Sequence, residues 1–476
     1  MYYTYLIYTL KQGEDIMIDF ASEARKYREE FINLLDQWIS IPSLYNAESV
    51  SVDMPFGKNV NEALKWFEDL GTGEGFNTKF VDGYATHIEY GEGAEYVYAF
   101  GHCDVVPPGD GWTCNPFKLL KSGDNLIGRG VIDDKGPLLA CFIALKLIRD
   151  NNLTLKRKIR IVAGGNEESG FRCIKHYFKN EPRPTYGFTP DAKFPVINGE
   201  KGATVITING NINSGSIEIS GGEVHNTIPN YVVVKGCNIE HKLKDIKNLV
   251  DKENLSLEFT QDKNIIPSFK LIGIGGHSSK PEKANNPIEK VFRLLNMVLK
   301  EDGTQELDSL FGGNNRLGQL FGLDLGGRCG VLTIVPTIIL VEKERLSLTL
   351  SVRYPENLTA TIIVEKICSY LQQHGLNKFE VKCISDKKTH YIEEDSLLVK
   401  KLYQIYLKHT GDTENAVRVT SAGTYAAEMI NSVVFGGEFP GGASGNAHMA
   451  GEHGSEEEFI KSIGIYAEAL YELCTL

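Results

Sequence analysis

The fold class is decided by GPLLACFIALKLIRD at residues 136–150 and KIRIVAGG at residues 158–165. The first run opens on a Gly-Pro pair and predicts a helix, and the second is a short apolar run of strand length that ends on two glycines. A helix followed so closely by a buried strand is typical of α/β architecture with a largely parallel sheet.

The sequence on both sides continues this alternation. Further helices are predicted at 18–40, ended by Pro42, and at 59–70, with Gly71 as C-cap, and further strands at 77–81, 85–90, 95–102 and 185–191. From about 204 to 386, strands such as LSLTLSVRY alternate with helical stretches near 286–300 and 359–373, and the helix–strand pattern returns after 387. We therefore expect an α/β protein: a domain with a mixed, largely parallel sheet, formed by 1–203 and 387–476, interrupted by an inserted α+β domain at 204–386.

Composition excludes several classes of protein. The chain has 476 residues, 42% hydrophobic and 24% charged, which is ordinary for a globular protein and excludes a disordered chain. Its 50 basic and 62 acidic residues give a net charge of −12, which argues against nucleic acid and anionic membranes as partners. No apolar run reaches the roughly 18 residues that a membrane span needs.

The start of the chain and its cysteines bear on location. MYYTYLIYTLKQGEDIM lacks a basic segment and a cleavage site, so it is only a weak candidate for a signal peptide. An alternative interpretation is that Met17 is the true start and residues 1–16 are an upstream extension. The nine cysteines form no CxxC pair. We interpret them as reduced thiols and expect a cytoplasmic protein.

Histidines and carboxylates follow predicted strands in five segments. In open parallel sheets, ligands gather at the carboxyl ends of the strands. The segments are GHCDVVPPGDGW with His102 and Asp104, GRGVIDDKGP with Asp133 and Asp134, AGGNEESG with Glu167 and Glu168, FTPDAKFP with Asp191, and FPGGASGNAHMAGEH with His448 and Glu452.

Each segment alone also has a structural interpretation. His102 could be a buried core histidine, the aspartate pair a helix N-cap, the glutamate pair an acidic helix start, Asp191 a turn residue and His448 a surface loop residue. Together they supply two histidines, several carboxylates and no cysteine, which suits Zn²⁺ or Mn²⁺. With one shared carboxylate, such a set can hold two metal ions roughly 3.5–4 Å apart.

These motifs, in this order and with TPDAKFPVINGEKG, resemble the cocatalytic metallopeptidase family of carnosinases, aminoacylases, succinyl-diaminopimelate desuccinylases and bacterial glutamate carboxypeptidase, and within it the PepV-type dipeptidases. The resemblance runs from about Met17 to the C-terminus. It implies that 1–203 and 387–476 form the catalytic domain, that 204–386 forms a lid, and that two divalent metal ions activate water to hydrolyse short peptides. A dipeptidase that releases the N-terminal residue is the favoured interpretation, and a single chain could be the working unit.

The resemblance also implies roles for individual residues. Asp133 would bridge the metals, with His102 and Asp191 at one ion and Glu168 and His448 at the other. Asp104 would orient His102, and Glu167 would be the general base. In the inserted domain, GGHSSKP makes His277 the donor to the oxyanion, while HNTIPN and SVRYPE place Asn226 and Arg353 at the substrate. SAGTYA places Gly423 and Thr424 near the substrate carboxylate.

Several alternatives stay open. Val131-Ile132, the SAGTY turn and the glycine-rich loop before His448 depart from the usual family pattern and leave the substrate preference undecided. His453 rivals His448 as the late ligand, and we prefer His448 because Glu452 follows it at the family's spacing. An N-acyl amino-acid deacylase or desuccinylase, or a silent peptide-binding relative, is the alternative function. The native metal, the preferred dipeptide, the oligomeric state and the position of the lid are not decided by the sequence.

Overall fold

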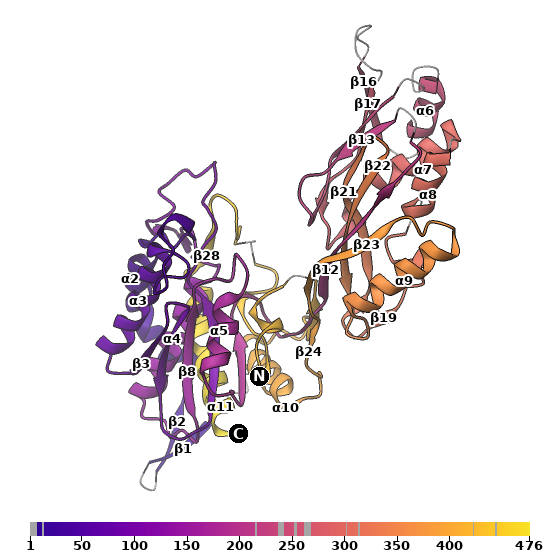
Figure 1. Cartoon of the computed structure of the whole chain (residues 1–476). Helices are drawn as coiled ribbons and strands as arrows, with labels where there is room; N and C mark the ends of the chain where they lie inside the picture. Colours follow the sequence, from indigo (N-terminus) through magenta and orange to yellow (C-terminus); the bar gives the residue numbers. More distant parts are fainter. Residues whose placement is uncertain are drawn as a thin grey trace. The chain divides into compact units, whose positions relative to one another are not determined.

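The computed structural model describes residues 7–11, 14–214, 217–236, 242–251, 255–260, 268–300, 302–312, 315–421, 423–442 and 445–476. The chain divides into two compact units (Figure 1). The main domain comprises Met1–Gly199, Ile392–Arg418 and Gly423–Leu476, and the inserted domain comprises Glu200–Tyr391 and Val419–Ala422. The architecture is the expected mixed α/β fold with an inserted α+β domain.

The helices and strands of the main domain are as follows. The helices are α1 (Phe20–Ala24), α2 (Arg28–Ile39), α3 (Lys58–Gly73), α4 (Lys135–Asp150), α5 (Arg172–Asn180), α10 (Leu397–Thr410) and α11 (Glu456–Thr475). The strands are β1 (Ile7–Lys11), β2 (Glu14–Ile18), β3 (Asn77–Val81), β4 (Ala85–Tyr90), β5 (Tyr96–His102), β6 (Leu120–Ser122), β7 (Asn125–Ile127), β8 (Lys158–Gly164), β9 (Tyr186–Thr189), β10 (Ala192–Lys193), β11 (Ile197–Glu200), β26 (Ser432–Val434), β27 (Gly437–Glu438) and β28 (His453–Ser455). Strand β25 (Arg418–Thr420) pairs with β11.

The central sheet of the main domain runs in the order β11-β26-β9-β5-β8-β4-β3. Its middle strands β26, β9, β5 and β8 are parallel. At one end β11 pairs antiparallel with β26, and at the other β4 pairs antiparallel with β8 and β3 antiparallel with β4. Every residue of β5 is buried, which is typical of a strand covered on both faces. The carboxyl ends of the parallel strands β5, β8 and β9 therefore lie at the same edge of the sheet.

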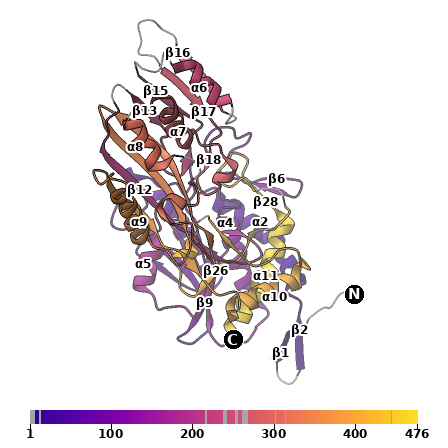
Figure 2. The same ribbon diagram turned by 90° about the vertical axis from the view of Figure 1, so that its right-hand side faces the viewer.

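Helices cover both faces of β5. Alternate side chains point to opposite faces, so Phe100 contacts Tyr177 of α5, whereas a side chain at Gly101 would meet Leu138 of α4. Helices α4 and α11 pack together, and α10 lies beside α11 (Figure 2). Among the described residues, none of the helices combines the length and hydropathy needed to cross a bilayer.

Two helix predictions need correction. The helix expected at 18–40 is interrupted by a 3-10 turn at Arg25–Tyr27, which separates α1 from α2. Gly71 is not a C-cap, because α3 continues to Gly73 and is capped by Glu74. A side chain at Gly71 would lie 2.6 Å from Cγ1 of Ile88, so this glycine lets α3 approach the sheet closely.

The inserted domain is an antiparallel sheet with helices packed on it. Its sheet order is β16-β17-β15-β13-β21-β22-β12-β23, and Figure 1 shows the helices along one side. The strands are β12 (Gly202–Asn211), β13 (Glu218–Gly221), β14 (Thr227–Ile228), β15 (Tyr231–Lys235), β16 (Ser256–Thr260), β17 (Ser268–Ile272), β18 (Gly276–His277), β19 (Gly326–Gly327), β20 (Gly330–Val331), β21 (Thr333–Glu342), β22 (Arg345–Tyr354), β23 (Glu380–Lys387) and β24 (His390–Tyr391), and the helices are α6 (Leu243–Val250), α7 (Pro287–Leu299), α8 (Asp302–Phe311) and α9 (Ala360–Gln373).

The inserted unit spans residues 200–391, together with Val419–Ala422. The expected insertion, 204–386, falls just inside the observed 200–391. Ala203 pairs with Lys387 in the β12–β23 ladder, so the residues beside each limit belong to the inserted sheet. The short segment Val419–Ala422, expected in the main domain, groups with the inserted one.

Candidate metal centre

Two buried strands and the loops that follow them bring the ligands together. His102 is the last residue of β5, and Glu167 and Glu168 follow the end of β8 at Gly164, after Gly165 and Asn166. Asp133 lies in the loop before α4, where the Asp133–Asp134 peptide bond is cis, and Asp191 lies between β9 and β10. His448 lies in the loop before β28 and has a backbone φ of 65°.

Asp133 lies between two histidines. Its Oδ1 is 3.0 Å from Nε2 of the buried His102, and its Oδ2 is 3.0 Å from Nε2 of His448. Nε2 of His102 is also 3.9 Å from Oδ2 of Asp191, and Nε2 of His448 is 3.1 Å from Oε1 of Glu168. Each oxygen of Asp133 thus faces a different set of donors, as a bridging carboxylate requires.

Three clusters have donor atoms that all lie within 4.8 Å of one another. One is His102, Asp133 and Asp191; another is Asp133, Glu168 and His448; the third is His102, Glu167 and Glu168. The first two share Asp133 and have only nitrogen and carboxylate oxygen donors, which fits a pair of divalent metal ions. His453 is in none of these clusters, and its Nδ1 is 2.9 Å from the carbonyl of Gly451.

Electrostatics in this region agree with a site built for cations. Burial, with the negative charge of Asp191 next in size, raises the pKa of Glu167 well above its usual value. Burial also raises the pKa of Glu168. Hydrogen bonding to Asp133 and then to Glu168 raises the pKa of His448 to about 10. Carboxylates this crowded repel one another, and divalent cations would relieve that repulsion.

Asp104 supports the site mainly through backbone groups. The Nδ1 of His102 lies 2.9 Å from the backbone carbonyl of Asp104 and 3.5 Å from its carboxylate. The two carboxylate oxygens accept the backbone N–H groups of Glu167 and Glu168, at 3.0 and 3.1 Å. Asp104 therefore holds both the histidine ring and the glutamate loop, which is the usual task of residues behind a metal ligand.

The turn predicted near the substrate carboxylate lies beside the same centre. Gly423 and Thr424 precede Tyr425, whose buried ring meets the His102 ring edge-on with centroids 6.1 Å apart. The Thr424 hydroxyl accepts the Ala426 N–H at 3.1 Å and so caps this short 3-10 turn. Ala422 of the SAGTYA motif lies outside the described residues, as does Cys237 among the cysteines.

The structure also gathers the three predicted residues of the inserted domain. Strand β14, which follows Asn226, pairs with β18, so that Thr227 lies opposite His277. The Ser278 hydroxyl is 2.9 Å from that of Ser351 on β22, the strand that carries Arg353. These contacts bring Asn226, His277 and Arg353 into one region of the inserted domain.

His277 is prepared to donate a hydrogen bond from Nε2. The Ser279 N–H donates to its Nδ1 at 3.2 Å, and the Ser279 hydroxyl lies 2.7 Å from the same atom, so Nδ1 accepts and the proton of the neutral ring lies on Nε2. Burial, and then the positive charge of Arg353, lowers the pKa of His277. The Nε of Arg353 is buried and has no hydrogen-bond partner among the described residues, so this guanidinium can donate hydrogen bonds to an anionic ligand.

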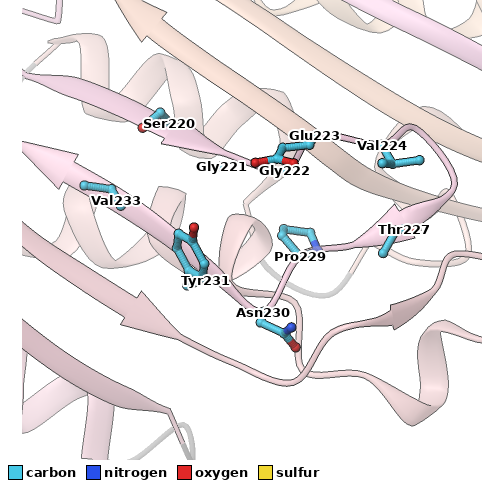
Figure 3. Close-up of a pocket in the computed structure, with 10 residues that line it drawn as sticks. All are labelled: Ser220, Gly221, Gly222, Glu223, Val224, Thr227, Pro229, Asn230, Tyr231 and Val233. Atoms are coloured by element: carbon cyan, nitrogen blue, oxygen red, sulfur yellow. The ribbon is translucent and has the colours of Figure 1, made fainter. Parts of the chain in front are cut away.

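A separate pocket of about 500 Å³ lies in the inserted domain (Figure 3). It is lined by the end of β13, the loop after it and the start of β15, with Glu223, Asn230 and Tyr231 among its residues. Glu223 is its only carboxylate among the described lining residues, and histidine is missing there. This pocket therefore lacks the donor set found around Asp133.

The sequence did not reveal the pairing of two residues behind the site. Arg129 and Glu452 form a buried ion pair, with Nη1 of Arg129 2.5 Å from Oε2 of Glu452. Glu452 entered the sequence argument only through its spacing from His448. The two charges are 323 residues apart, and a single sequence carries no signal that pairs them.

Comparison with known proteins agrees with this geometry. Residues 99–472 match peptidase family M20/M25/M40. The chain is 32% identical over 471 residues to the Bacillus subtilis (strain 168) protein named "Putative dipeptidase YtjP", covering 96% of this chain and 100% of that one. It is 30% identical to a Staphylococcus aureus (strain USA300) protein that is also named as a dipeptidase, covering 96% and 99%.

Solved structures share the fold at low sequence identity. Human carnosine dipeptidase 1 has a TM-score of 0.54 and 16% identity over 96% of this chain and 99% of its own. Aminoacylhistidine dipeptidase from Vibrio alginolyticus has a TM-score of 0.56 and 14% identity over 93% and 96%. Bacillus subtilis YXEP, described as a dinuclear metal binding peptidase, has a TM-score of 0.51 and 12% identity over 94% and 98%. With a family match over most of its length and a relative above 30% identity, the chain belongs to peptidase family M20/M25/M40.

Proposed function

We propose that this protein is a metal-dependent dipeptidase that releases the N-terminal residue of short peptides. The observation that carries the proposal is Asp133, whose two oxygens face two histidines and join two ligand clusters. His102 and Asp191 would complete one metal site, and Glu168 and His448 the other. The dipeptidase names of the relatives support the substrate class.

The donor set suits two ions of either Zn²⁺ or Mn²⁺, since it contains imidazole nitrogen and carboxylate oxygen without thiolate. When bound, such a pair lowers the pKa of water and polarises the carbonyl of the scissile bond. Side chains of the protein would transfer the proton, donate a hydrogen bond to the oxyanion and bind the substrate.

Glu167 is the proposed general base. It takes a proton from the attacking water and later gives it to the leaving amine. A carboxylate is a residue type that commonly performs both proton transfers. The Asp104 carboxylate, which accepts the Glu167 N–H, fixes the backbone that carries this base.

The remaining residues would bind the substrate. His277 would donate from Nε2 to the oxyanion that forms during attack, and Arg353 would bind the substrate carboxylate with its planar fork. Asn226, Gly423 and Thr424 would contact the rest of a short peptide. A required carboxylate close to the reacting bond limits the length of the substrate, which favours dipeptides.

Two further proposals concern the setting of the enzyme. Every cysteine in the described ranges is free, which suits the reducing cytoplasm. The inserted domain, which carries His277 and Arg353, would act as the lid within one chain, so a monomer could be active.

Glu167 and Glu168 offer a matched pair for the test. Glu167→Gln should retain the bound metal and lose about 10²–10⁴-fold in kcat, because it removes the base alone. Glu168→Gln should lose metal, because it removes a proposed ligand. Metal content by mass spectrometry and hydrolysis of a dipeptide panel measure the two effects separately, and unchanged turnover in Glu167→Gln would refute the assigned base.

The same panel tests the alternative function. Chelator-stripped enzyme is reconstituted separately with Zn²⁺ and Mn²⁺ and offered dipeptides and N-acyl amino acids. Preference for dipeptides supports the proposal, whereas preference for N-acyl amino acids would make the protein a deacylase. Peptide binding without turnover by metal-loaded protein would identify a silent relative.

A further inference from the structure

The Glu452 carboxylate is fully buried and is hydrogen-bonded by the loop that carries Asp133. Its Oε1 accepts the backbone N–H groups of Gly130, Ile132 and Asp133, at 2.9, 3.1 and 3.2 Å. The last of these belongs to the residue that joins the two ligand clusters. One carboxylate therefore determines the path of the backbone that leads into Asp133.

Arg129 compensates the charge of that carboxylate and connects it to a second loop. Its side chain is 1% exposed, and its Nη1 donates to Oε2 of Glu452 at 2.5 Å. Its Nη2 donates to the carbonyls of Pro107 and Pro108 at 3.4 and 3.3 Å, in the loop after His102 and Asp104. The guanidinium also lies 5.4 Å from the ring of Trp112 in the same loop.

The pair thus joins three separate segments of the chain. His102, Asp133 and His448 each come from a different one, and Glu452 follows His448 by four residues. Backbone pairing between β28 and β7 holds the third segment beside the Asp133 loop, and the Gly128 N–H donates to the Glu452 carbonyl at 3.0 Å. The ion pair lies where these segments meet.

A buried ion pair is costly to form, since both charges leave water, and it is a poor source of stability in itself. Here both charges hydrogen-bond to each other and to backbone groups of the ligand-bearing loops, while Nε of Arg129 is buried without a hydrogen-bond partner in the described part of the chain. Because Arg129 neutralises Glu452, the pair adds no net negative charge behind a cluster already rich in carboxylates.

We propose that Arg129 and Glu452 are positioning residues, which hold the loops of His102, Asp133 and His448 at the spacing that two metal ions require. The inference rests on the proposed function only in taking this cluster as a metal centre. It predicts that breaking this pair weakens metal binding as well as the fold, whereas breaking a buried ion pair elsewhere in the main domain weakens the fold alone.

The test uses Arg129→Met, which removes the charge and all three side-chain hydrogen bonds, and Glu452→Gln, which keeps an acceptor for the N–H groups. Arg129→Lys restores the charge. Metal affinity, measured by chelator competition with Zn²⁺, should fall by about 10–100-fold in the first two variants and recover in part in the third. The visible absorption spectrum of the Co²⁺-loaded protein should change in Arg129→Met, because it reports ligand geometry.

Glu181→Gln is the matched control. Glu181 pairs with Arg160 at 2.8 Å in another buried ion pair, near the start of β8 and away from the loop that follows its end. It should lower the melting temperature of the metal-free protein with metal affinity and the Co²⁺ spectrum unchanged. If Arg129→Met and Glu452→Gln behave like this control, the pair is only structural and the inference is wrong.

The outcome is separable from that of the proposed function. If the wild-type protein binds metal but hydrolyses no dipeptide, the function fails while the affinities still test the positioning role. If it hydrolyses dipeptides and all the variants bind Zn²⁺ like the wild type, the positioning role fails alone. Should Arg129→Met not fold, Arg129→Lys and Glu452→Gln still decide the question by the same two measurements.

Discussion

His277 shows how two neighbours can set the hydrogen-bonding role of one ring. The Ser279 N–H donates to Nδ1, and the charge of Arg353 adds to burial in disfavouring the imidazolium. A neutral ring with its proton on Nε2 is a hydrogen-bond donor at neutral pH. Such a donor can stabilise a developing oxyanion.

His277→Ala should therefore lower kcat for a dipeptide by about 10²–10³-fold and change KM much less, because the lost bond forms mainly in the transition state. Ser279→Ala is the milder comparison, since it keeps the backbone N–H that orients the ring. Steady-state kinetics at saturating metal separates the two. A rise in KM at constant kcat would mean that His277 binds the substrate and not the oxyanion.

His87 gives a pH prediction outside the active site. Its side chain is buried beside the Tyr177 hydroxyl, and burial, followed by the charge of Arg160, lowers its pKa to about 4. An unfolded histidine has a pKa near 6.5, so the unfolded chain binds the extra proton first as the pH falls. The native state should thus lose about 3 kcal/mol of stability between pH 6.5 and pH 4 through this residue.

Urea unfolding at a series of pH values measures this loss. In His87→Gln the loss between pH 6.5 and 4 should be smaller by that amount. Equal pH profiles for wild type and His87→Gln would show that the buried ring does not control acid stability.

Among the helices and strands, α3 contains two glycines that should respond in opposite ways to alanine. A side chain at Gly71 would lie 2.6 Å from Cγ1 of Ile88 and 2.8 Å from Cγ2 of Thr78, whereas one at Gly73 would meet nothing within 4 Å. Gly71→Ala should cost about 1–3 kcal/mol through overpacking. Gly73→Ala should add up to about 1 kcal/mol, because alanine favours the helix.

Chemical denaturation of both variants measures these changes in the free energy of unfolding. Each serves as the control for the other, since the substitution and the helix are the same. Destabilisation by Gly73→Ala, or tolerance of Gly71→Ala, would mean that helix propensity and not the approach to the sheet governs this helix.

Gly71 also shows why some elements could not be read fully from the sequence. A glycine near the end of an amphipathic run looks the same whether it caps the helix or lets it approach a sheet, since the difference lies in Thr78 and Ile88. Strands β3 and β4 begin and end at the predicted residues, because their short apolar runs are bounded by turn residues. Local pattern was sufficient where local chemistry sets the boundary.

Some residues of the candidate site could likewise be predicted from the sequence, and others could not. His102, Glu168 and Asp191 could be named because they stand at or just after the ends of β5, β8 and β9, and the carboxyl ends of parallel strands meet at one edge. Asp133 and His448 lie in loops away from those strand ends, and only the resemblance to the metallopeptidase family implied their roles. The pairing of Arg129 with Glu452 could not be predicted, because nothing in either segment specifies a partner 323 residues away. Ligands at strand ends have a local signature, whereas the residues that hold them depend on how loops meet in three dimensions.

For the chain as a whole, the division into two domains means that bound metal should stabilise only the domain that contains its ligands. Every residue of the three donor clusters belongs to the main domain. A ligand that binds only the folded state stabilises it by RT ln(1 + [L]/Kd), about 2.7 kcal/mol at a hundred times Kd. Adding Zn²⁺ or Mn²⁺ to chelator-treated protein should therefore stabilise the main domain by that amount and leave the inserted domain unaffected.

Hydrogen exchange followed by mass spectrometry can measure this for each segment. Slower exchange is expected on metal addition in peptides of β5, β8 and α4, with unchanged exchange in peptides of β12, β21 and β22. Asp133→Asn, which removes the shared carboxylate, should abolish the difference between metal-free and metal-loaded protein. Protection that spreads equally through the inserted strands would show that the two domains open as one cooperative unit, and protection that survives in Asp133→Asn would place the metal elsewhere in the chain.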